Sequence, residues 1–144
     1  MAERLYVDTS VLAKRYLNES SSDEVDEYLT THPYCAVTNL VLVEMRSLLA
    51  RRRRLGALTR AAEANIFSTV ARDVSNYFQV LVFGETTLAT AIEVLSKVTN
   101  TSLRAQDSLH LAAAIDGECG TLATADRSMA AACKQLGVAV TLFA

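Results

Sequence analysis

The chain has 144 residues, 51% of them hydrophobic, which is enough to close the core of one domain. Its 14 Lys and Arg and 16 Asp and Glu leave a net charge of −2. This balance excludes a protein that binds nucleic acid through overall positive charge, but it leaves room for a local basic patch. High hydrophobicity with little net charge also excludes an intrinsically disordered chain.

The sequence shows no sign of a membrane or secreted protein. No apolar run approaches the roughly 20 residues of a membrane span. Residues 5–7 are too short an apolar stretch for a signal peptide before Asp8 interrupts them. Cys35, Cys119 and Cys133 are odd in number and far apart, so we expect reduced thiols rather than a disulfide scaffold or a zinc site. These features predict a cytoplasmic protein.

Short apolar segments alternate with longer amphipathic ones along the whole chain. Strands are expected at residues 4–7, 34–37, 79–83, 121–124 and 138–143. Helices are expected at residues 11–17, from 20–23 to a break at 32–33, from 38–39 to about 55, and at 59–77, 85–98, 104–115 and 126–136. This alternation predicts a parallel sheet covered on both faces, in a single α/β domain over residues 1–144.

Two acids directly follow predicted strands: Asp8 after the first and Asp126 after the fourth. Ligands bind at the carboxyl ends of the strands in an open parallel sheet. The two carboxylates therefore meet if the first and fourth strands are neighbours, which the sequence alone does not establish. The competing interpretation of each acid is a helix N-cap, the common role of Asp between a strand and a helix.

Two more acids fall on apolar stripes of predicted helices. Glu44 and Asp107 each have a leucine four residues away on both sides. A charged carboxylate in such a place is costly unless something pairs with it. The plain interpretation makes Glu44 a partly exposed helix residue whose stem lies along the apolar surface, or an ion-pair partner of Lys14 or Arg46. It makes Asp107 a buried ion-pair partner of Arg104.

A divalent cation would satisfy several of these acids together. Four clustered carboxylates repel one another and tend to protonate without one. Mg²⁺ prefers oxygen ligands and keeps several waters, so a few carboxylates suffice. Such a cluster supports hydrolysis of phosphodiester bonds without a Ser, Cys or His nucleophile.

Four segments together give the chain a family resemblance. They are Val7-Asp8-Thr9-Ser10-Val11-Leu12, Glu44 within a helix, residues 103–112 (LRAQDSLHLA) and residues 123–127 (ATADR). With them the chain resembles a PIN-domain ribonuclease, and its size and layout resemble the toxin of a VapBC-type toxin–antitoxin pair. Residues 56–100 contribute no motif of their own.

The resemblance implies a three-layer α/β/α sandwich with a mainly parallel five-stranded sheet, and an endoribonuclease that depends on Mg²⁺ or Mn²⁺. The matching catalytic positions are Asp8, Glu44, Asp107 and Asp126. The three aspartates would hold the metal, and Glu44 would complete its shell or orient the attacking water. Thr9 or Ser10 would support the surroundings of the first acid. A homodimer and a small inhibitory antitoxin are also implied.

Basic residues are candidates for RNA contact. Arg104 and Arg127 adjoin two of the four acids, which makes them our candidates for binding near the scissile phosphate, with Lys14 and Arg15 behind them. Residues 51–54 are four consecutive arginines, with Arg60 beyond them. Such a run at a helix end is usually solvated and suits the helix dipole, or else it contacts phosphate or the antitoxin. Four consecutive residues spread around a helix, so no more than two face one ligand.

Other functions remain open from the sequence. An aspartyl-phosphate phosphatase usually has a second Asp two residues after its nucleophile, where this chain has Ser10. A non-catalytic PIN-like or receiver-like module would use the acids to bind a basic peptide, although a receiver would need paired early acids and a Lys after a late strand. His110 is expected to be a hydrogen-bonded core histidine.

Overall fold

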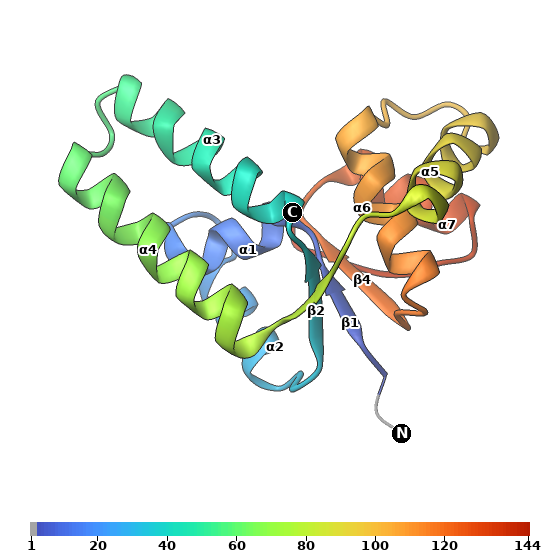
Figure 1. Cartoon of the computed structure of the whole chain (residues 1–144), viewed down its shortest axis with the longest axis horizontal. Coiled ribbons are helices and arrows are strands. Elements are labelled where there is room, and N and C mark those ends of the chain that lie inside the picture. The colour runs from blue at the N-terminus through green and yellow to red at the C-terminus, as the bar shows by residue number, and fades with distance from the viewer. Residues whose placement is uncertain (1–2) are drawn as a thin grey trace.

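A computed structural model describes residues 3–144 as one five-stranded sheet with helices on both faces (Figure 1). The strands are β1 (Leu5–Val7), β2 (Cys35–Thr38), β3 (Gln79–Leu81), β4 (Thr121–Thr124) and β5 (Ala139–Leu142). They run in the order β3-β2-β1-β4-β5, and every neighbouring pair is parallel. The predicted α/β/α sandwich is confirmed, and its mainly parallel sheet proves to be wholly parallel.

The helices match the predicted segments within a few residues. They are α1 (Thr9–Tyr16), α2 (Ser22–Thr30), α3 (Leu40–Arg54), α4 (Arg60–Tyr77), α5 (Glu85–Lys97), α6 (Ala105–Asp116) and α7 (Arg127–Gln135). In the part of the chain that the structure describes, no helix is long and apolar enough to cross a membrane.

Alternation along the central strand divides the core in two. Leu5 and Val7 of β1 point into a cluster with α1 to α4, while Tyr6 between them points into a cluster with α5 to α7. Both clusters are closed to solvent at their centres, as Met45 on the first side and Leu111 on the second show. Strands buried on both faces explain the near-continuous apolar runs of β1 and β2.

Three strands are shorter than the sequence predicts: β1 loses one residue at one end, β5 loses one at each end, and β3 stops two residues early. The apolar run 79–83 predicts five strand residues, but β3 ends at Leu81. Leu81 pairs with Thr38, the last residue of β2, so the residues after it have no neighbouring strand. Val82 is accordingly exposed despite its strong preference for strands.

The three cysteines are free, and Cys35 and Cys133 are buried. Burial raises the pKa of the Cys35 thiol to about 11 and that of Cys133 to about 12. Such thiols stay protonated at neutral pH and are poor nucleophiles.

Candidate active site

The strand order brings the first and last acids of the sequence motif together. β1 and β4 are neighbours, with Val7 in register with Ala123, and the Asp8 N–H donates to the Ala123 carbonyl at 3.0 Å. Asp8 therefore leaves the sheet beside Thr124, two residues before Asp126. Asp8 and Asp126 were expected to meet only if the first and fourth strands are neighbours, and they are.

Asp8 stands at the N-cap position of α1, but hydroxyl groups rather than the helix backbone hold its side chain. Its side chain makes no capping bond to α1, so the interpretation of Asp8 as only an N-cap is wrong. Its Oδ2 instead accepts from Thr124 Oγ1 at 2.7 Å and from Ser10 Oγ at 3.0 Å. The residue is 5% exposed. Two donors on a nearly buried carboxylate satisfy one of its oxygens and fix its direction.

Asp126 does cap a helix. Its Oδ1 accepts from the backbone N–H groups of Ser128 at 2.7 Å and Met129 at 3.2 Å, at the start of α7. Its own N–H donates to Thr124 Oγ1 at 3.0 Å. Thr124 thus links Asp126 to Asp8 through one buried hydroxyl group. The sequence motif contained Thr124, but nothing in its pattern gave it this role.

Asp107 completes a group of three aspartates. It lies in the first turn of α6 and accepts from the backbone N–H of Arg104 at 3.2 Å, while its predicted ion pair with the Arg104 guanidinium does not form. Burial raises the pKa of Asp107, and the charges of Asp126 and Asp8 raise it further. Repulsion of this kind acts between carboxylates that face one another across a short distance.

Glu44 faces the same region from α3. Its Oε1 accepts from Thr9 Oγ1 at 2.7 Å and from His110 Nε2 at 2.5 Å. One oxygen of Glu44 is therefore fully used by the protein, whereas no hydrogen bond to the other is found in residues 3–144. This arrangement holds the carboxylate in place and leaves one oxygen available.

The predicted partners of Glu44 are occupied elsewhere. Lys14 Nζ donates to the Ser20 carbonyl at 2.6 Å. The Arg46 guanidinium lies 4.7 Å from the centre of the Phe67 ring, a cation–π contact. The plain interpretation of Glu44 as a surface ion pair is therefore wrong.

His110 is the buried histidine that the sequence predicts, at 1% exposure. Its Nδ1 lies 2.6 Å from the Tyr6 hydroxyl, and its Nε2 lies 3.8 Å from Asp8 Oδ1. Burial lowers the pKa of His110, but the hydrogen bond to Glu44 and the nearby carboxylates outweigh it, so the pKa lies above its usual value. The sequence missed the link to Glu44, although His110 follows Asp107 by one helical turn.

The donor set suits a hard divalent cation. Asp8, Asp107 and Asp126 offer carboxylate oxygens from three elements, and Asp107 in particular is unfavourable as an anion without a counter-charge. Within residues 3–144, no three such side chains enclose a single point closely enough to complete a metal cage. Mg²⁺ does not need one, because it usually binds through one or two carboxylates and retained waters.

The two predicted RNA-binding arginines flank this group. Arg104 precedes α6 and Arg127 begins α7, and both are exposed. Burial raises the pKa of Asp107, and the positive charge of Arg104 acts against this larger effect by lowering it. Neither arginine forms an ion pair with another residue of the described part of the chain.

Comparison with known proteins shows which family has this arrangement of residues. The PIN domain family matches residues 5–135, which span all four acids. No curated protein sequence matches the chain.

Solved structures of similar fold are numerous. VapC20 of Mycobacterium tuberculosis, described as a sarcin–ricin loop cleaving toxin, has a TM-score of 0.71 and 21% identity, covering 89% of this chain and 94% of that chain. FitAcB from Neisseria gonorrhoeae has a TM-score of 0.68 and 19% identity, covering 94% of this chain and 95% of that chain. VapBC2 from Rickettsia felis, bound to a DNA fragment from its promoter, has a TM-score of 0.71 and 12% identity, covering 98% of this chain and 99% of that chain. These likenesses show a shared fold.

Proposed function

We propose that this chain, which belongs to the PIN-domain family, is a metal-dependent endoribonuclease and the toxin of a VapBC-type toxin–antitoxin pair. The toxin role is supported by the fold that the chain shares with VapC20, a toxin that cleaves the sarcin–ricin loop, and with VapBC2. The proposed domain is residues 1–144, of which residues 1 and 2 lie outside the described part.

One observation carries the nuclease assignment: Asp8, Asp107 and Asp126 share an end of the sheet at the cost of mutual repulsion. Burial and the other two charges raise the pKa of Asp107. If these residues served only the structure, replacing one of them with a neutral side chain would make the folded protein more stable. The repulsion is relieved when a cation binds, which is the expected property of a site built for one.

Each acid has a separate role in the proposed reaction. Asp8, fixed by Thr124 and Ser10, and Asp126, fixed at the start of α7, would hold Mg²⁺ or Mn²⁺ together with Asp107. The bound ion would polarise the phosphoryl oxygen and lower the pKa of a water molecule. Glu44 keeps one oxygen toward Thr9 and His110, and its other oxygen would accept the proton of the attacking water.

Arg104 and Arg127 would bind the phosphates on either side of the scissile bond. Both stand at the starts of helices whose other first-turn groups include site aspartates. The helix N-termini add their own partial positive charge for an anion. A guanidinium presents paired donors that match phosphate oxygens.

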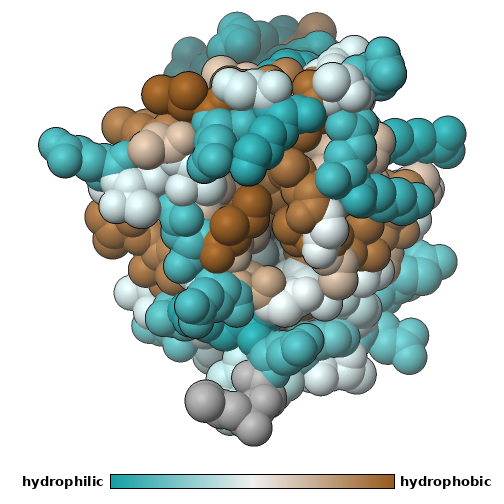
Figure 2. Space-filling view, turned by 90° about the vertical axis from the view of Figure 1, so that its right-hand side faces the viewer, coloured by the Kyte–Doolittle hydropathy of each residue, from teal (hydrophilic) through white to brown (hydrophobic). Residues whose placement is uncertain are grey.

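The partners of this proposal are a small antitoxin and a second copy of the chain, in the cytoplasm. α5 supports the dimer, because Leu88, Ile92 and Leu95 lie along one of its faces and are exposed. Figure 2 shows apolar side chains gathered on the side of the molecule that carries α5. We expect Ile92→Glu to shift the protein from dimer to monomer in sedimentation; an unchanged dimer would place the interface elsewhere.

The test is cleavage of a mixed RNA pool by purified, partner-free protein with Mn²⁺, with Mg²⁺ and with EDTA. We expect cutting that requires the metal and disappears in Asp8→Asn. Asp26→Asn, at an exposed position of α2, is the matched control and should cut normally. Retained turnover in a folded Asp8→Asn protein would contradict the assignment. Absence of both cutting and metal binding would favour the non-catalytic binding module.

A further inference from the structure

The positive charge of the chain is concentrated in one short segment. Residues 46–60 contain six arginines and no acid, so they carry a charge of +6. The other eight Lys and Arg face all 16 Asp and Glu, which leaves −8 for the rest of the chain. The segment is the last part of α3, the turn after it and the first residue of α4. A protein with a small net charge is thus strongly polarised.

Half of these arginines have partners within the fold. Arg52 pairs with Glu19, and Arg53 Nε lies 3.0 Å from Glu63 Oε1. The first pair ties α3 to the segment between α1 and α2, and the second ties α3 to α4 within the hairpin. Arg46 lies over the Phe67 ring, as described above.

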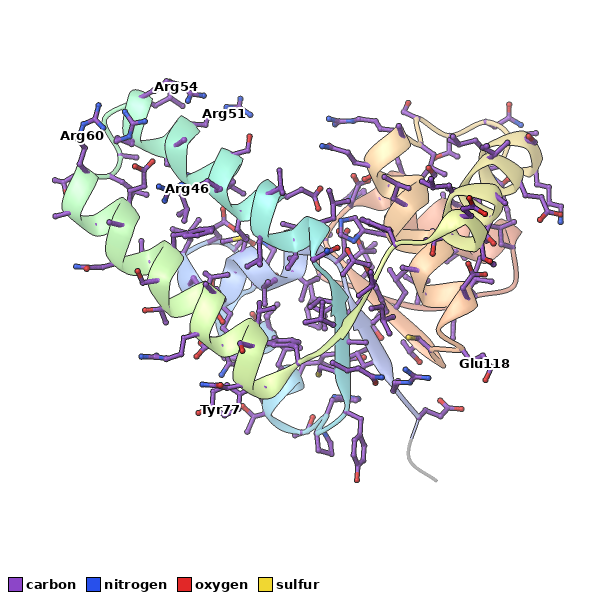
Figure 3. All side chains as sticks on the ribbon, in the orientation of Figure 1. Arg46, Arg51, Arg54, Arg60, Tyr77 and Glu118 are labelled. Atoms are coloured by element: carbon purple, nitrogen blue, oxygen red, sulfur yellow. The ribbon has the colours of Figure 1, made fainter. Side chains whose placement is uncertain are left out.

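The other three form what we call the tip patch: Arg51, Arg54 and Arg60. All three are exposed, and none has a carboxylate within 4 Å among residues 3–144. Figure 3 shows them at the outer end of the α3–α4 hairpin, directed into solvent, whereas Arg46 lies between the two helices. The tip patch is therefore a set of cations free to bind an external anion.

Helix stability explains only part of the tip patch. Arg51 and Arg54 lie in the last turn of α3, where cations interact favourably with the helix dipole. Arg60 is the first residue of α4, where a cation opposes the dipole. Placing three like charges at one tip is also unfavourable. Contacts and dipole effects within the described residues therefore account for only part of the patch.

The tip patch is continuous with the active site along α3. Arg51 follows Glu44 by seven residues, close to two full turns, so both lie on the same side of the helix. At 1.5 Å per residue, Arg51 is about 10 Å and Arg54 about 15 Å along the axis from Glu44. At a rise of about 3.4 Å per nucleotide in a stacked strand, this corresponds to about three to four nucleotides.

We propose that the tip patch binds the phosphate backbone of the RNA substrate about three to four nucleotides away from the bond that is cut. The inference rests on the proposed ribonuclease function and extends the site along α3. Guanidinium groups suit this role because their paired donors match phosphate oxygens. Contacts to phosphates add affinity and fix register without reading sequence. The enzyme would therefore prefer substrates long enough to span both places.

The test measures RNA binding in EDTA, where no cleavage occurs. Two fluorescent RNAs, of about 12 and about 4 nucleotides, are titrated at several salt concentrations. Arg51→Gln/Arg54→Gln/Arg60→Gln should weaken binding of the longer RNA about tenfold, and should reduce the slope of log Kd against log salt by about 2, since each phosphate contact contributes about 0.7. Binding of the shorter RNA should barely change. The triple Arg→Lys variant keeps the charge and should keep the slope.

The control removes the same charge elsewhere. Arg72→Gln/Lys97→Gln/Lys134→Gln alters three exposed cations outside the tip patch and should leave the slope nearly unchanged. An equal effect of both triple variants, or none from the tip variant, would overturn the proposal, as would wild-type protein that binds no RNA. Binding through the tip patch by a protein that cuts nothing would instead refute the nuclease assignment alone. Loss of binding to an acidic peptide, with RNA binding intact, would assign the patch to a protein partner.

Discussion

The two ends of α3 place charged side chains under opposite conditions. Near its start, Glu44 is largely enclosed and has Thr9 and His110 as partners for one oxygen. At its end, Arg51 and Arg54 are exposed to solvent and form no ion pair among residues 3–144. A charge can be kept inside a fold only when its polar atoms are satisfied, whereas a charge in water needs no partner to persist. The role of Glu44 therefore depends on where its carboxylate is held, whereas the role of Arg51 and Arg54 depends on their positive charge.

This difference predicts which substitutions matter. At the buried end, small changes remove a hydrogen bond or a ligand and should have large effects on activity or folding. At the tip, even the loss of three charges should change binding and leave the fold intact. The following predictions test the contrast from the largest effect to the smallest.

Asp107→Asn should reduce RNA cleavage about 1,000-fold, because a metal ligand contributes several kcal/mol of transition-state stabilisation. Asn keeps the size of the side chain and an oxygen for the Arg104 N–H. The measurement is the single-turnover rate with saturating Mn²⁺. Asp116→Asn, at the exposed end of the same helix, is the control and should retain the wild-type rate. A rate for Asp107→Asn within tenfold of wild type would remove Asp107 from the site.

Tyr6→Phe should destabilise the protein by about 1–3 kcal/mol, since it leaves His110 Nδ1 buried without its hydrogen-bond partner. Urea unfolding measures the change. Tyr77→Phe removes the same hydroxyl group from a side chain that is 72% exposed and should have no measurable effect. Equal stability of the two variants would mean that the Tyr6–His110 bond adds nothing to the fold.

The metal-free protein should lose stability relative to Asp107→Asn as the pH rises. Burial and the charges of Asp126 and Asp8 raise the folded-state pKa of Asp107 above its value in the unfolded chain. The folded state therefore binds the proton more tightly, and the stability linked to that proton is present below the unfolded pKa, about 3.9, and is lost as the pH rises through the folded pKa. In EDTA at neutral pH, Asp107→Asn should melt at a higher temperature than wild type. The difference in melting temperature between the two proteins should narrow toward pH 4. A constant difference would show that it does not come from the raised pKa of Asp107.

Substitutions in the tip patch should hardly change the stability of the fold. Arg51→Gln and Arg54→Gln each remove an exposed cation that makes no ion pair with any described residue, so each should change the free energy of unfolding by less than about 0.5 kcal/mol. Arg53→Gln, which breaks the contact with the buried Glu63, is the informative comparison and should cost more. Urea unfolding of the three variants tests this ranking.

The sequence predicted the helices and strands well, because each depends on a local pattern of residues. Alternating apolar segments gave the strands and helices, and residues that follow strands gave Asp8 and Asp126. Adjacency of β1 and β4 is a property of the chain's topology, so the meeting of these two acids could only be stated conditionally. The shortened β3 has the same cause, since β2 sets where its pairing ends.

Partners of individual side chains were the least predictable part of the site. We expected Lys14 or Arg46 as an ion-pair partner of Glu44, yet Lys14 donates to the Ser20 carbonyl and Arg46 lies over the Phe67 ring. Glu44 meets His110, which lies 66 residues away along the chain. Contacts of this range depend on how helices pack across the sheet, and no local spacing reports them.

The most direct test of the account is Mn²⁺ binding by the RNA-free protein, measured by calorimetry. Wild-type protein should bind the ion, Asp8→Asn and Asp107→Asn should each lose at least about tenfold in affinity, and Arg51→Gln should bind as wild type does. Such a result would show that the aspartates at the end of the sheet form the metal site, separate from the charged tip. Equal affinity in wild type and both aspartate variants would contradict the central claim.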